Sequence, residues 1–115
     1  MGPISEKRRF PRLGSVHLVS YTQLDKEKNP VETGMCKSLE LSQGGVTIQT
    51  HRPFAVNTGL EMVIAIEERL IKSKGRVVHS RQVGRGRYDV GVCFTEVEEE
   101  DRLVMQDFFQ KLSAE

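Results

Sequence analysis

Residues 84–94, GRGRYDVGVCF, contain the clearest strand pattern in this sequence. After the glycines at positions 84 and 86, apolar residues occupy every second position, namely Tyr88, Val90, Val92 and Phe94. An alternation with a period of two residues is typical of a β-strand with one buried face. Glycines directly before such a strand favour a tight turn. This stretch therefore predicts the second half of a β-hairpin.

Five further strands are predicted before this segment. Turn-forming pairs such as Asn29-Pro30 and Gly44-Gly45 separate short apolar stretches. The five predicted strands cover residues 14–23, 34–41, 46–50, 60–67 and 70–81. Gly75 interrupts the fifth strand and is expected to mark a bulge. The first strand has apolar residues on both parities, so we expect at least partial cover on both of its faces.

The hydrophobic period changes after residue 95. Thr95 and Glu98 have the spacing of a capping box, in which the two side chains satisfy N–H groups at a helix start. Val104, Phe108 and Leu112 then follow at intervals of four, which predicts an amphipathic helix over about residues 98–113. Six strands and one helix predict an all-β fold, a small six-stranded antiparallel barrel with a C-terminal α-helix.

Length and charge limit the functions open to this chain. Its 115 residues suffice for one domain, and 17 basic against 16 acidic residues give a net charge of +1. Such a balance argues against binding to DNA or RNA. The longest apolar run, Met62–Ile66, is far shorter than the ~18 residues of a membrane helix. With no signal segment at the start, we expect a cytoplasmic protein without membrane insertion.

Patterns of catalysis and metal binding are missing from the sequence. It has no nucleophile elbow, no paired-histidine zinc motif and no phosphate loop. The two cysteines, Cys36 and Cys93, have no metal-ligand spacing. A disulfide is possible by count, but a reducing compartment favours two small buried thiols. We predict that the protein is not an enzyme and holds no metal ion.

A basic cluster, Lys7-Arg8-Arg9-Phe10-Pro11-Arg12, precedes the first predicted strand. The planar guanidinium fork of arginine suits a phosphate or the N7/O6 edge of guanine. Pro11 favours an extended or turning backbone that can wrap a ligand. Taken alone, such a cluster is also what a solvated basic tail looks like.

A second cluster, Glu40-Leu41-Ser42-Gln43-Gly44-Gly45, lies where one predicted strand turns into the next. A carboxylate can accept hydrogen bonds from the N1–H and N2–H groups of guanine, and a serine hydroxyl can donate to a phosphate. The glycine pair lets a ligand approach the backbone closely. Taken alone, this cluster is also what an ordinary hairpin turn with a polar edge looks like.

Together, the two clusters resemble the motifs of the PilZ domain family. Arg8 and Arg12 match its R-x-x-x-R motif ahead of the first strand. Ser42 and Gly45 match [D/N]-x-S-x-x-G at a later turn, where Glu40 replaces the family's Asp or Asn. A later G-V-x-F pattern is also present at residues 91–94, and the resemblance extends from about residue 6 to the terminal helix.

The resemblance implies a receptor for cyclic di-GMP, a bacterial second messenger. In the family, the arginine segment wraps the dinucleotide, usually as two intercalated molecules, and the turn motif grips a guanine and its neighbouring phosphate. His79 is expected to stack on or border the ligand, and Arg81 to add a phosphate contact. The residues that the resemblance and the local chemistry assign to the ligand are Arg8, Arg9, Arg12, Glu40, Ser42, Gly44, Gly45, His79 and Arg81.

The expected organisation is a flexible basic segment at residues 1–13 and a barrel domain at residues 14–115. Binding of one or two nucleotides is expected to order the segment and to change a surface that a protein partner reads. No other cofactor is expected, and the chain is expected to be a monomer or weak dimer. Because Glu40 carries one more rotatable bond than the family's residue, the alternative is a degenerate adaptor that binds proteins without nucleotide.

Overall fold

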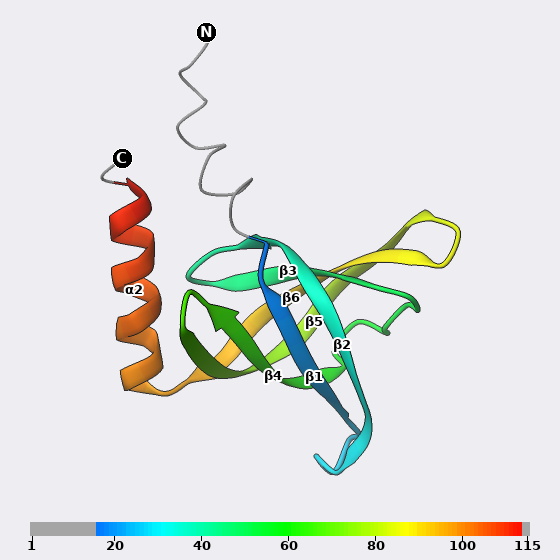
Figure 1. Cartoon of the computed structure of the whole chain (residues 1–115). Coiled ribbons are helices and arrows are strands. Elements are labelled where there is room, and N and C mark those ends of the chain that lie inside the picture. Colours follow the sequence, from blue (N-terminus) through cyan, green and yellow to red (C-terminus); the bar gives the residue numbers. More distant parts are fainter. Residues whose placement is uncertain (1–15, 114–115) are drawn as a thin grey trace, which may run out of the picture.

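The computed structural model describes residues 16–113, and these form an antiparallel barrel of six strands with one helix (Figure 1). The strands close in the order β1-β2-β3-β6-β5-β4, which confirms the predicted fold class. The basic segment predicted at residues 1–13 lies outside the described residues. The elements are β1 Leu18–Leu24, β2 Pro30–Leu41, β3 Gly45–Thr50, β4 Gly59–Ile66, β5 Arg69–Gly84, β6 Arg87–Val97 and α2 Glu99–Ser113.

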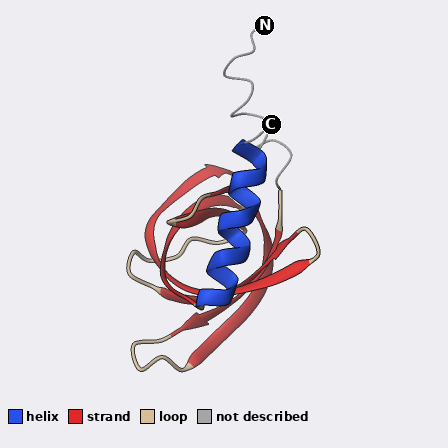
Figure 2. Ribbon diagram, turned by 90° about the vertical axis from the view of Figure 1, so that its left-hand side faces the viewer, coloured by secondary structure: helices blue, strands red, loops and turns tan. Residues whose placement is uncertain are grey.

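One hydrophobic core fills the barrel and continues under the helix. The alternation along each strand sends every second side chain inward, as expected for a small closed barrel. Fully buried members from five of the strands are Val19, Ile48, Ile64, Ile71 and Val90. Figure 2 shows α2 lying across one open end of the barrel. Met105 and Phe108 of α2 are buried there, so the helix closes that end.

The first strand differs from its prediction. Val19 and Tyr21 are buried, but Val16 and Leu18 on the other parity are 58% and 62% exposed. The outer face of this strand is therefore covered much less than its inner face. A closed barrel has a single interior, and within residues 16–113 no second layer lies over the outer face of β1 at these positions. The strand also begins at Leu18, later than the predicted residue 14.

The second strand begins at Pro30, earlier than predicted, because the β1–β2 hairpin continues to a tight turn. Leu24 pairs with Pro30 at the end of the ladder. The Asp25 carboxylate closes the turn by accepting hydrogen bonds from the backbone N–H groups of Glu27 at 2.9 Å and Asn29 at 2.8 Å. Backbone groups that would otherwise be unpaired are satisfied in this way, so the turn can stand clear of the barrel.

The later elements follow most of their predictions, but the predicted capping box at Thr95 is wrong, because Thr95 lies inside β6 and the helix begins only at Glu99. The register between β5 and β6 shifts between Lys74 and Gly75, which confirms the predicted bulge. The helix begins at Glu99, one residue later than predicted. Its first turn is tied to β5, since the backbone N–H of Lys72 donates to the carboxylate of Asp101 at 3.0 Å. No helix in the described part of the chain is long and apolar enough to cross a membrane.

A buried histidine joins β1, β4 and the helix. His17 is 8% exposed, and its Nδ1 donates to the carbonyl of Ala65 at 2.9 Å. Its ring meets Phe108 edge-on, with 5.6 Å between the centroids. Its Nε2 is buried and has no hydrogen-bond partner. Burial lowers the pKa of His17, although the Ala65 carbonyl and the charge of Glu67 partly oppose this effect.

This environment predicts a loss of stability in mild acid. The pKa of His17 in the folded chain lies below its ordinary value of 6.5, so the unfolded chain takes up the proton first as the pH falls. The free energy of unfolding should therefore decrease below that value. Urea denaturation near neutral pH and near about pH 5.5 measures the decrease. His17→Gln should reduce it, and His51→Gln, at an exposed site, should not. An equal decrease in all three chains would contradict this origin.

Candidate ligand-binding site

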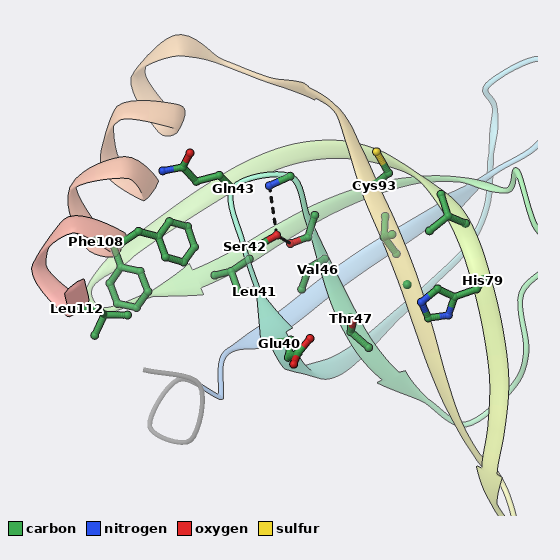
Figure 3. Close-up of a pocket in the computed structure, with 16 residues that line it drawn as sticks. Glu40, Leu41, Ser42, Gln43, Val46, Thr47, His79, Cys93, Phe108 and Leu112 are labelled. Carbon is green, nitrogen blue, oxygen red and sulfur yellow. Dashed lines mark hydrogen bonds between the residues drawn. The ribbon is translucent and has the colours of Figure 1, made fainter. Parts of the chain in front are cut away.

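The β2–β3 turn is held by its own serine. The backbone N–H of Ser42 donates to the carbonyl of Gly45 at 2.9 Å. The Ser42 hydroxyl donates to the same carbonyl at 3.3 Å and accepts from the N–H of Gly44 at 3.3 Å (Figure 3). The predicted hydroxyl thus shapes the turn, and it does so at an exposed position where a ligand can still reach it.

The two glycines of the turn have different surroundings. A side chain on Gly45 would collide with the carbonyl oxygen of Val92, because β3 and β6 approach closely at this point. A side chain on Gly44 would meet nothing within 4 Å. The backbone at Gly44 therefore faces open space, while Gly45 lets the turn lie against β6. Both predicted glycines lie at the rim of the same groove.

Strand register brings other predicted residues into one row on the outer face. Glu40 of β2 pairs with Thr47 of β3, and Thr47 pairs with Gly91 of β6. Gly91 in turn pairs with His79 of β5. The imidazole of His79 lies so close over Gly91 that a Cβ atom there would collide with the ring. The structure thus places Glu40 and His79 at the two ends of one cross-strand row.

Arg81 lies in the next row, opposite Asp89. Both residues line a hollow of about 760 Å³ together with Glu40, Thr47 and His79. Sequence reasoning missed Thr47 and Asp89. The alternation along each strand indicates that both side chains point outward. It does not show which strands are neighbours, so it could not place the two residues beside His79. The hollow combines the carboxylates of Glu40 and Asp89 with the side chains of His79 and Arg81. It can therefore contact both donor and acceptor groups of a ligand.

A groove of about 590 Å³ continues from this hollow toward the helix. Its polar wall is the β2–β3 turn, and its apolar wall is formed by Leu41 with Phe108, Phe109 and Leu112 of α2 (Figure 3). Glu40, Thr47 and His79 line both spaces, so the hollow and the groove form one continuous surface. Apolar surface beside a polar turn suits a purine base, whose faces are apolar and whose edges are polar.

The predicted arginines Arg8, Arg9 and Arg12 lie outside the described residues. The position at which the described chain begins is nevertheless defined. The backbone N–H of His17 donates to the Ser38 hydroxyl at 2.9 Å, and the N–H of Ser38 donates back to the His17 carbonyl at 2.8 Å. Ser38 precedes Glu40 by two residues, so the chain enters β1 beside the strand that carries the turn motif.

The cysteines are unpaired, as predicted, but each is only half-buried. Burial raises the pKa of Cys36 to about 11, so its thiol stays protonated at neutral pH. Cys93 lines the groove. Among residues 16–113, no group of three His, Cys, Asp or Glu side chains could hold a metal ion.

Comparisons with known proteins agree with the motifs. The model of the PilZ domain matches residues 6–111, which confirms the resemblance seen in the sequence. No curated protein matches the chain. Among solved structures, MrkH of K. pneumonia in its apo state is 17% identical, with a TM-score of 0.63 over 84% of this chain and 46% of that one. This chain therefore spans about half the length of MrkH.

A second similar structure is the PilZ domain of CeSA from a cellulose synthesizing bacterium. It is 14% identical, with a TM-score of 0.58, and the match covers 84% of this chain and 92% of that one. At these identities the likeness shows the fold.

The close approach at the turn predicts different effects for two adjacent alanines. Gly45→Ala should lower the free energy of unfolding by about 1–3 kcal/mol, because the backbone carbonyl of Val92 must move. Gly44→Ala is the matched control and should change it by less than about 0.5 kcal/mol. Urea denaturation of the two variants measures the difference. Equal stabilities would show that β6 yields at this point without cost.

Proposed function

Because this chain belongs to the PilZ domain family, whose members generally bind cyclic di-GMP, we propose that it is a receptor for this dinucleotide. The observation that carries the proposal is the convergence of the predicted site residues of the barrel on one outer surface. Glu40, the Ser42–Gly45 turn and His79 line a single groove. Arg81 lines the adjoining hollow. The segment with the R-x-x-x-R motif joins the barrel at β1, beside the strand that carries Glu40.

The barrel offers contacts for a guanine base. The carboxylate of Glu40 accepts from the N1–H and N2–H groups of the base edge. The imidazole of His79 is exposed and lies over Gly91, where it gives the base a flat surface on which to stack. The open space above Gly44 lets the base or its sugar approach the turn without a clash.

Guanidinium groups neutralise the phosphates in this proposal. Arg81 is exposed and points into the hollow that Glu40 and His79 also line. Arg8 and Arg12 supply bidentate hydrogen bonds from the other side of the ligand. The four chain steps from Arg12 to Val16 can span up to about 14 Å, which gives the segment reach over the barrel surface around the start of β1.

Binding then orders the arginine segment over the barrel, and a protein partner reads the altered surface. A site that is open on its outer side is compatible with one or with two nucleotides per chain.

A second candidate function rests on Glu40. Its side chain is one methylene longer than the family's Asp or Asn, so the proposed contact to guanine costs more side-chain entropy. If that cost is decisive, the chain acts as an adaptor that binds proteins without nucleotide.

Titration calorimetry with cyclic di-GMP tests the receptor. Arg8→Ala and Arg12→Ala should each weaken binding by about 10–150-fold, since each removes hydrogen bonds to a charged group. Arg85→Ala at the tip of the β5–β6 hairpin is the control and should bind as the wild type does. In amide NMR of the same titration, residues 6–13 should become ordered. Absence of binding by the wild type would reject the receptor and leave the adaptor.

Replacing Glu40 by the family's residue tests the second candidate. Glu40→Asp should raise the affinity for cyclic di-GMP several-fold, because one fewer bond must be fixed on binding. Glu61→Asp, at an exposed position of β4, is the matched control and should leave the affinity unchanged. An affinity that falls in Glu40→Asp would show that the barrel is fitted to the longer side chain.

A further inference from the structure

The outer side of the barrel away from the proposed nucleotide site carries exposed apolar residues. In the closed order of strands, β1 lies three strands from β6, so the two are on opposite sides. Leu70, Met35 and Leu18 are 68%, 66% and 62% exposed. They are the three most exposed large apolar side chains in the described part of the chain, and all three lie around β1.

Register places these residues in two adjacent rows. Leu18 of β1 pairs with Lys37 of β2, while Ala65 of β4 pairs with Leu70 of β5. Leu18 is level with Ala65, because the next residue along β1, Val19, pairs with Ile64.

In the second row, Met35 pairs with Ser20, Ser20 with Val63, and Val63 with Lys72. We call the outward side chains of Leu18, Met35, Val63, Ala65 and Leu70 the β1–β4 face.

Packing among residues 16–113 does not explain this face. The strands are paired on both sides in a closed barrel, so no strand edge needs protection. The helix, which could have covered apolar surface, lies across the end of the barrel. Exposing leucine and methionine to water gains nothing for folding, and contiguous apolar patches on a soluble domain commonly mark interaction sites.

Charge indicates the kind of partner. Within the two rows the charged residues are two lysines, Lys37 and Lys72. Glu61, Glu96 and Glu98 lie at the edge of the face, in a hollow that Lys72 also lines. Neither lysine side chain forms an ion pair with a described residue. A second copy of this chain would bring lysines toward lysines, which like-charge repulsion disfavours. An acidic partner would instead pair with them.

We propose that the β1–β4 face docks a partner protein through an amphipathic segment with apolar side chains flanked by acidic ones. The apolar side chains of that segment pack on Leu18, Met35 and Leu70, and its carboxylates meet Lys37 and Lys72. Docking at this face does not require nucleotide, so the proposal stands or falls separately from the receptor function.

Two synthetic helical peptides test this docking with the full chain and without cyclic di-GMP. One carries leucines on one face and glutamates on the other, and the second has lysine at each glutamate position. The acidic peptide should bind and shift the amide signals of β1 and β4, and the basic peptide should not. Leu18→Ser with Leu70→Ser should weaken binding by about tenfold or more. Leu103→Ser, at an exposed leucine of α2, is the matched control and should bind normally.

A charge reversal separates recognition from simple stickiness. Lys37→Glu with Lys72→Glu should exchange the preference, so that the basic peptide binds better than the acidic one. The proposal is overturned if neither peptide binds the wild type, if both bind equally, or if Leu103→Ser weakens binding as much as the double serine variant does. It is also overturned if sedimentation shows a wild-type dimer that the double serine variant dissolves, because a second copy would then occupy the face.

Discussion

Closure of the barrel is the constraint on which the rest of this structure depends. Because β1 pairs with both β2 and β4, every strand has two neighbours, one inner face and one outer face. The register of each pair is then fixed by which side chains fill the interior. A slip of one residue in β3 would bury Thr47 and expose Ile48, and it would also separate Glu40 from the row that ends at His79. Core packing and the geometry of the site are therefore set by the same register.

The close approach of β3, β5 and β6 depends on small residues where the site lies. Gly45 leaves room for the carbonyl of Val92, and Gly91 leaves room for the ring of His79. Because neither glycine has a side chain, the backbone of β6 can approach Gly45 closely and the ring of His79 can approach Gly91 closely. The turn motif is thus a packing motif as well as a proposed binding motif, since Ser42 and Gly45 hold the turn through their own hydrogen bonds. Their presence in a sequence alone therefore does not distinguish a receptor from an adaptor.

Most of the fold could be predicted from the sequence, because a period of two residues identifies strands such as residues 87–94 and a period near four identifies the helix. The bulge at Gly75 followed from its place inside a strand. The pattern could not show that β3 lies beside β6, which is about forty residues away along the chain. For that reason Asp89 and Thr47 were missed as lining residues. It also could not show that Leu18 is mostly exposed, because mixed apolar residues look the same whether a second layer is present or not.

The second strand connects the two outer surfaces for which binding is proposed. Glu40 and the turn motif lie at its end, and Met35 and Lys37 lie in its middle. Between them, the pairing with β3 shifts register between Ser38 and Glu40. A bulge leaves one residue of the strand outside the ladder and bends the strand at that point. Ser38 at this bulge also holds the start of β1 through two hydrogen bonds with the backbone of His17. Glu40, the bulge and the start of β1 are therefore joined by direct backbone connections and hydrogen bonds, and both of these strands contribute to the β1–β4 face.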